Sequence, residues 1–221
     1  MVRDSASAPT EPGDNSYVAR RADVVAFSLP SVPELEIRPR VLPAVTIGEL
    51  VGAGAVEVLE SPPTLLPVDT GSPMLSAKDI RVDRSPSTSG DPSVPGAVTT
   101  RPGDVLVVTG SGPTIVRVCA VSALLAPRVA LVRANPGVVD HRFLAGVLQA
   151  AADNEDGKLS DLFAVGFPRM PLAEQRLTGD SVVELMALDD AWRRQRSAVE
   201  RLVREGIAGL AGGRLSPGPT T

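Results

Sequence analysis

Apolar residues recur at helical spacing over the last quarter of the chain, after an abrupt start at PLAEQ (171–175). Proline suits the first turn of a helix, and the glycine pair at 212–213 suits its end. Acidic residues gather early in the stretch and arginines late, in agreement with the helix dipole. The pattern predicts one long amphipathic helix over residues 170–211, whose end Gly206 and Gly209 should fray.

The length of this predicted helix indicates a partner. At about 1.5 Å per residue, roughly 38 residues extend about 57 Å, which is longer than a domain of this size is wide. Periodicity alone leaves open the alternative that the helix lies on its own domain. We expect pairing with another helix through apolar positions close to a seven-residue repeat. The candidate interface residues are Leu185, Leu188, Trp192, Val199 and Leu202.

Upstream, the pattern is that of a β-rich unit. Asp140 stands where a helix N-cap should, ahead of apolar residues that share one helical face, and Thr46 can cap a short helix that ends near Gly52. β-branched runs separated by turn residues predict strands. The expected strands are 55–59, 105–109, 115–121 and 129–133, with a short extended piece at 162–167. The fold class is therefore α+β: a mixed, β-rich domain followed by a long C-terminal amphipathic helix.

Turn-forming residues mark the remaining segments. Residues 1–42 are rich in proline, which predicts an extended N-terminal segment with a short strand at 23–29. The stretch 85–96 consists almost wholly of such residues and predicts a long polar loop. The expected domains are the N-terminal segment 1–42, the β-rich domain 43–169, the helix 170–211 and a flexible tail 212–221.

Composition and charge exclude several kinds of site and of partner. The chain has 221 residues and a formal charge of −4, so any contact with a polyanion must come from a local basic patch. The one cysteine, Cys119, excludes an intramolecular disulfide and a cysteine-cluster metal site, and fits a reducing compartment. No signal peptide and no membrane span is visible. We expect a cytoplasmic protein without a membrane partner.

Each stretch that resembles a catalytic or cofactor-binding motif lacks a residue that the motif requires. His141, the only histidine, follows a helix N-cap and has no visible partner for a triad or a metal site. The GSG at 110–112 links two strands and lacks a Walker lysine. The DNEDG at 153–157 lacks both essential carboxylates of a calcium loop, and the NPG at 135–137 lacks the aromatic residue of a base-flipping methyltransferase motif. We expect no catalytic site, no metal and no cofactor.

A set of short motifs carries a family resemblance. VTIGEL (45–50) is followed by MLSAKDI (74–80), RPGDVLV (101–107), the strand 129–133, the helix with Phe143-Leu144, and MPLAEQR (170–176). In this order and spacing the chain resembles the target recognition domain of the type I restriction-modification specificity subunit family. It is especially similar to the version found at the C-terminus of some bacterial adenine-specific DNA methyltransferases. The resemblance spans about residues 43–211, and its last motif is the most specific.

The resemblance implies a sequence-specific DNA-binding half-subunit without its own catalytic site. It would direct a DNA methyltransferase subunit, with or without a restriction subunit, to double-stranded DNA. A full specificity subunit has two such domains and two long helices, so this chain would form a homodimer or pair with a second specificity half. The basic residues around the 85–90 loop are the first DNA-binding choice, and the arginines at 117, 128 and 133 are second choices. The candidates are Lys78, Arg81, Arg84, Arg101 and Arg117.

Three alternatives stay open. A recognition domain that has lost its DNA affinity would be a protein interaction or regulatory module. For any single arginine, a surface cation that keeps the protein soluble is as good an explanation as a phosphate contact. An enzyme acting alone is the weakest alternative, because no acid-base or metal set is visible.

Overall fold

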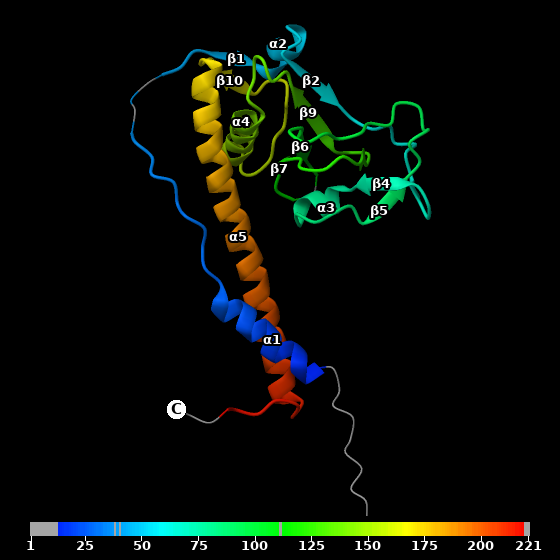
Figure 1. Cartoon of the computed structure of the whole chain (residues 1–221), viewed down its shortest axis with the longest axis vertical. Coiled ribbons are helices and arrows are strands. Elements are labelled where there is room, and N and C mark those ends of the chain that lie inside the picture. Colours follow the sequence, from blue (N-terminus) through cyan, green and yellow to red (C-terminus); the bar gives the residue numbers. More distant parts are fainter. Residues whose placement is uncertain (1–12, 38, 40, 111, 219–221) are drawn as a thin grey trace, which may run out of the picture. The chain divides into compact units, whose positions relative to one another are not determined.

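The computed structural model describes residues 13–37, 39, 41–110 and 112–218. The chain divides into two compact units. Residues 34–183 make the first, here called the globular unit, and residues 1–33 together with 184–221 make the second, the helical unit. Helix α5 (Leu172–Ala211) begins in the globular unit and continues in the helical unit (Figure 1). The expected α+β class with a long C-terminal helix is confirmed.

The larger sheet of the globular unit carries the core. Its strands lie in the order β2 (Val56–Leu59), β9 (Ala130–Ala134), β6 (Val105–Val108) and β7 (Ile115–Val118), all antiparallel. Every residue of β6 is buried. A continuous apolar run suits a strand covered on both faces, and helices cover both: α3 (Ala77–Arg81) and α4 (His141–Asn154) each contact β6 and β7.

The smaller sheet has the order β3 (Pro67–Val68), β5 (Thr88–Gly90), β4 (Ser72–Leu75) and β8 (Leu124–Leu125). Strands β4 and β8 are parallel. The prediction of one loop over 85–96 is wrong at Thr88–Gly90, which pairs with both neighbouring strands. A Cβ atom added at Gly90 would lie 3.0 Å from the sulfur of Met74, so this small residue fits a close approach that propensity alone does not reveal.

Helix caps confirm two sequence-based expectations. Thr46 caps α2 (Ile47–Gly52) in a capping box with Glu49, and Asp140 caps α4 by accepting hydrogen bonds from the backbone of Arg142 and Phe143.

A two-stranded sheet of β1 (Ala44–Thr46) and β10 (Gly166–Pro168) joins the two ends of the globular unit's sequence. The predicted strands at 55–59, 105–109 and 129–133 agree with β2, β6 and β9 to within one residue.

The prediction of an extended N-terminal segment is wrong for residues 13–26, which form helix α1 (Gly13–Ala26). The predicted strand at 23–29 is absent from the described chain for the same reason. The prolines of this segment leave the window from Gly13 to Leu29 free, so nothing breaks a helix there. The prediction of an extended chain rested on the proline content of the whole segment and overlooked this proline-free window.

In the helical unit, α1 packs against α5. The ring of Tyr17 lies over Gly206, where an added Cβ atom would be 3.1 Å from the ring. Arg20 forms an ion pair with Glu205 at 3.0 Å, and the Gln195 amide donates to the carbonyl of Val24 at 3.1 Å. The expectation that Gly206 frays the helix is therefore wrong: it is buried, as is Gly209 beside Leu215. Both glycines permit close approach rather than ending the helix.

None of the described helices combines the length and the apolar character that crossing a bilayer requires.

Candidate nucleic-acid interface

The predicted basic residues lie on or near α3, which a capping box starts. Ser76 accepts a hydrogen bond from the backbone of Asp79, and Asp79 accepts one in return from the backbone of Ser76 at 3.0 Å. The helix presents Lys78, which is exposed, and Arg81, which is half-buried. The sequence therefore places at least two of the five candidates on one short, capped helix.

Asp79 holds the segment that follows α3. Its carboxylate is fully buried and accepts hydrogen bonds from the hydroxyls of Ser76 (2.6 Å) and Ser87 (2.7 Å), and from the guanidinium of Arg84 (2.5 Å). Burial alone would raise the pKa of Asp79, but these hydrogen bonds outweigh it and hold the pKa well below its usual range. Arg84 thus has a structural partner within the chain.

Arg81 is also engaged. Its guanidinium donates to the carbonyl of Pro113 at 2.7 Å and to that of Thr109 at 3.4 Å, both in the turn of the β6–β7 hairpin. This geometry ties α3 to the hairpin. A guanidinium held by two carbonyls retains its charge but loses freedom to reorient toward a phosphate.

Arg84 and Arg117 come together at a second place. Both line a pocket of about 260 Å³ between α3 and β7, together with the carboxylates of Asp79 and Asp83. Two cations and two carboxylates around one pocket balance in charge. The structure therefore gives these two candidates a local environment that is mixed rather than positive.

Lys78 and Arg128 lie at the same end of the smaller sheet. Strands β4 and β8 are parallel, with Leu75 opposite Leu125, and each cation follows its strand by three residues. Because the ends of parallel strands meet at one edge of a sheet, the two cations leave the same edge. Both side chains are exposed, and within the described part of the chain neither has a recorded hydrogen bond or ion pair. Arg128, a second choice in the sequence, thus joins Lys78.

Arg101 lies apart from this pair. Residue Thr99 bridges Leu124 in the antiparallel sense, so the chain at Arg101 has moved past the opposite end of β8. Its backbone donates to Asp104 at 2.7 Å, and its side chain is exposed. The five candidates therefore do not form one patch: the structure separates Arg101 from Lys78.

Arg133 serves mainly to hold the fold. Its guanidinium donates two hydrogen bonds to the buried carboxylate of Asp104, at 2.9 and 2.7 Å, and one to the carbonyl of Thr99. The hydrogen bonds to Asp104 raise the pKa of Arg133 above its ordinary value against the opposing effect of burial, and the carboxylate of Glu57 adds to the rise. The RPGDV segment is thereby fixed to β9.

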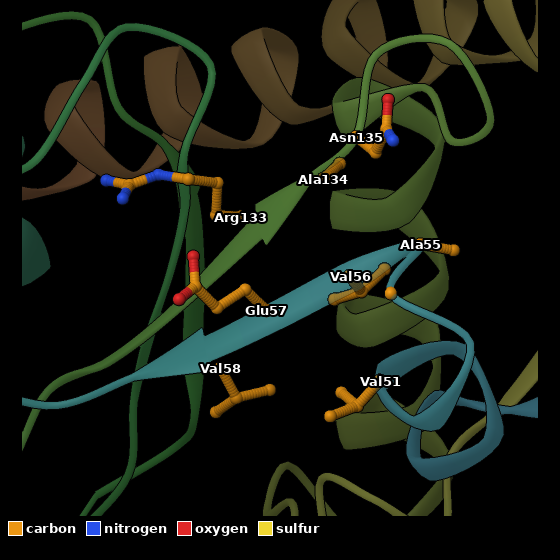
Figure 2. Close-up of a pocket in the computed structure, with 9 residues that line it drawn as sticks. Val51, Ala55, Val56, Glu57, Val58, Arg133, Ala134 and Asn135 are labelled. Atoms are coloured by element: carbon orange, nitrogen blue, oxygen red, sulfur yellow. The ribbon is translucent and has the colours of Figure 1, made fainter.

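A pocket of about 520 Å³ lies beside the edge strand β2. Figure 2 shows Arg133 and Glu57, from neighbouring strands, extending to the same side of it. The rest of the lining is mostly apolar and includes Val51, Val56 and Val58. Arg133 is the one cation in this lining, and its guanidinium is already bonded to Asp104. The lining therefore presents a mostly apolar surface rather than an acid-base pair.

Chemistry-bearing residues elsewhere are isolated. The ring of His141 lies against Gly103, and the buried thiol of Cys119 is 3.1 Å from the carbonyl of Val121. Within residues 13–218, apart from the three undescribed positions, no group of three histidine, cysteine or acidic residues could hold a metal ion.

The second candidate surface is a stripe along the helical unit's part of α5. Of the predicted seam, Leu185, Trp192 and Val199 are exposed, whereas Leu188 and Leu202 are half-buried. Exposed apolar residues continue toward the end of the helix at Val203, Ile207 and Leu210. We call the following set the α5 stripe: Leu185, Leu188, Trp192, Val199, Val203, Ile207 and Leu210.

The sequence reasoning missed the buried polar residues that hold these surfaces in place. Asp79 stands three residues after Ser76, the spacing of a capping box, and that signal was available. Gln175 is 4% exposed, and no periodicity marks a glutamine as buried. Its position within the MPLAEQR motif was the only hint.

Comparisons with known proteins give only distant likenesses. No protein-family model and no curated protein matches the sequence. Among solved structures, the chain is similar to the HsdS subunit from Thermoanaerobacter tengcongensis, with 19% identity, a TM-score of 0.47 and 87% of this chain covered. A chain from structural work on complex assembly and conformational transition of the type I R-M system has 19% identity, a TM-score of 0.49 and 90% coverage. The chain spans about half the length of these two structures, 51% and 52%.

Proposed function

We propose that this chain is a sequence-specific DNA-binding half-subunit that directs a partner DNA methyltransferase, alone or with a restriction subunit, to its target. In this proposal the globular unit reads DNA, and α5 pairs with the α5 of a second copy. The order of the sequence motifs supports the assignment to the type I specificity family. The observation that carries the proposal is the α5 stripe, an apolar surface that α1 leaves exposed.

The stripe follows an eleven-residue repeat rather than the expected seven. The positions of the repeat advance by three, four and four residues from Leu185 to Leu210, and Arg196 occupies the one position of the repeat that the apolar stripe lacks. An eleven-residue repeat corresponds to about 3.67 residues per turn, so two such helices pair with little or slightly right-handed supercoil. This spacing keeps the apolar positions on one face over the whole length of the helical unit.

The same spacing is self-complementary in the antiparallel sense. With a two-fold axis between positions 197 and 198, Leu185 faces Leu210 of the second copy, Leu188 faces Ile207, and Trp192 faces Val203. The acidic residues of α5 lie mainly in its first half and the arginines in its second, so antiparallel pairing also brings opposite charges together. A two-fold interface of this kind closes at two copies.

On the globular unit, the proposal assigns phosphate contacts to the exposed cations without a structural partner. Lys78 and Arg128 lead because they leave the same edge of the smaller sheet, and Arg101 contributes separately. Phosphate contacts give affinity and position, whereas base contacts give specificity.

Salt dependence tests the DNA-binding surface. We expect the full chain to bind a pool of random-sequence duplexes with log affinity falling linearly against log salt, by about 0.9 for each phosphate contact. The double variant K78E/R128E should bind more weakly and reduce the slope by about 1.8. Fluorescence anisotropy over a salt series measures both. K158E, which reverses one charge at an exposed lysine after α4, is the matched control for K78E alone, and an equal loss for K158E contradicts the assignment.

Truncation tests the docking role of α5. Gln175 and Gly179 pack within the globular unit, so a chain ending at Val183 keeps them. We expect this chain to stay folded and to lose co-purification with a co-expressed partner adenine methyltransferase, whereas the full chain retains it. Circular dichroism checks the fold and size-exclusion chromatography the complex. Association that survives removal of residues 184–221 excludes docking through this helix.

A protein interaction module without DNA affinity is the second candidate. It is favoured by the net charge of −4 and by the carbonyl and carboxylate partners that Arg81 and Arg84 already have. Its expected result is the absence of any mobility shift with random duplexes at low salt, even with the methyltransferase present.

A further inference from the structure

The first turns of α5 are joined to the start of α4 by one buried side chain. The amide oxygen of Gln175 accepts a hydrogen bond from the backbone of Asp140 at 3.0 Å. Its amide nitrogen donates to the carbonyls of Met170, at 3.0 Å, and Val138, at 3.3 Å. One glutamine therefore bonds the segment that leads into α5, the turn before α4 and the N-cap of α4. All of these residues belong to the globular unit.

Close backbone approach follows one turn later along α5. A Cβ atom added at Gly179 would lie 2.9 Å from the backbone nitrogen of Phe143 and would also collide with the side chain of Asp140. An ion pair between Arg142 and Asp180 lies beside this contact. Since Gly179 follows Gln175 by four residues, both occupy one face of the helix.

A third contact fixes the angle between the two helices. Gly146 of α4 accepts the side chain of Val182, and an added Cβ atom at Gly146 would lie 2.7 Å from a methyl group of that valine. Gln175, Gly179 and Val182 are spaced by four and three residues, so three successive turns of α5 contact α4 or its N-cap. At the start of α5, the hydrogen bonds of Gln175 set the position of the helix. Further along, the close packing at Gly179 and Gly146 sets the angle at which α5 crosses α4.

We propose that Gln175 is a positioning residue that sets the direction in which α5 starts from the globular unit, and through it the half-site spacing that a dimer accepts. This inference rests on the proposed function for its DNA-level consequence. From Val183 to Ala211 the helix extends about 42 Å at about 1.5 Å per residue. A tilt of about 5° at the start displaces the far end by about 3.7 Å, close to the rise of about 3.4 Å per base pair.

Leucine at position 175 removes the hydrogen bonds while keeping a side chain of similar volume. We expect Q175L to leave the backbone groups of Val138, Asp140 and Met170 without this partner, so that α5 samples several directions. G179A should displace α5 through a direct clash. L177Q, an exposed position on the same turns (72% exposed), is the matched control and should behave as the unsubstituted chain.

Two measurements test the inference, and the first does not depend on the proposed function. Spin labels at A150C and V183C, both in the globular unit, report the distance between α4 and α5 in the full chain. We expect one narrow distance distribution for the unsubstituted chain and L177Q, and a broadened or shifted one for Q175L and G179A. An unchanged distribution in Q175L overturns the positioning role, whether or not the protein binds DNA.

The second measurement is selection from duplexes that carry two half-sites separated by variable spacers. Q175L should keep the half-site sequence of the unsubstituted chain and accept spacings about one base pair longer and shorter. An unchanged spacing preference, with only a lower unfolding midpoint, would show that Gln175 is merely structural. If the unsubstituted chain selects no DNA, the proposed function fails, and the distance distributions alone decide the role of Gln175.

Discussion

Replacing Asp79 with alanine should lower the free energy of unfolding by about 3 kcal/mol. The carboxylate is fully buried and accepts hydrogen bonds from two serines and from Arg84. Its removal breaks these part-buried hydrogen bonds, and each hydrogen bond to a charged group contributes about 1.5–3 kcal/mol. The ion pair itself adds little to this sum, because Arg84 is 43% exposed. Urea unfolding of D79A followed by circular dichroism measures the change.

Asp91 supplies a matched control for this experiment. Its carboxylate accepts hydrogen bonds from the backbone and the hydroxyl of Ser93, at 2.9 and 2.7 Å, but it is exposed. D91A should therefore unfold close to the unsubstituted chain, since water replaces the lost partner. Equal destabilisation in D91A and D79A would contradict the importance of burial at Asp79.

The stability that Asp79 supplies also depends on pH in a defined direction. The folded pKa lies below that of the unfolded chain, which is about 3.9 for aspartate. The unfolded state therefore binds the proton more readily. The contribution of Asp79 is complete above about pH 5 and declines as the pH falls through and below about 3.9. The difference in unfolding free energy between D79A and the unsubstituted chain should shrink over that range.

Introducing glutamate at Trp192 should weaken self-association by about 100-fold or more. The indole is 57% exposed in the single chain and, in the antiparallel register, covers Val203 of the second copy. Tryptophan at the centre of an interface commonly contributes at least 2 kcal/mol, and a two-fold dimer loses two copies of it. A charge placed in an apolar seam adds a desolvation cost. Sedimentation equilibrium over a concentration series measures the dissociation constant.

Ser197 is the control position for this variant. It is exposed and lies on the side of α5 away from the stripe. S197E introduces the same charge into the same helix and should leave the dissociation constant within about threefold. A monomeric unsubstituted chain at all concentrations would refute the pairing of α5, while equal effects of W192E and S197E would refute the stripe as its surface.

Elements with a strong local signal could be predicted from the sequence. The α5 start at PLAEQ, the caps at Thr46 and Asp140, and the β-branched runs of β2, β6 and β9 all rest on local pattern, and the structure contains them. Strand β5 could not be predicted in this way because its stability comes from two neighbouring strands rather than from its own turn-forming residues. Helix α1 was missed because its interpretation followed the proline content of the whole segment.

The candidate site was predicted less completely than the fold. Arginine is recognisable in a sequence, but its partner is not. Arg81 reaches the turn at Pro113, and Arg133 reaches Asp104, across 32 and 29 residues of chain. These bonds depend on tertiary packing, which decides whether a cation serves the fold or remains exposed. Lys78 and Arg128 gain their importance from a parallel strand pair that no periodicity reveals.

The packing of α1 on α5 also constrains the order in which the molecule can be completed. Gln195 and Val24 are 171 positions apart in the chain, and Arg20 meets Glu205. During synthesis, α1 emerges before the globular unit and can acquire these partners only after Glu205 has left the ribosome. In sequence, the globular unit lies entirely between α1 and the helical unit's part of α5, so it can fold first. Its folding shortens the flexible loop that must close before α1 and α5 can pack together. The helical unit is thus completed after the globular unit.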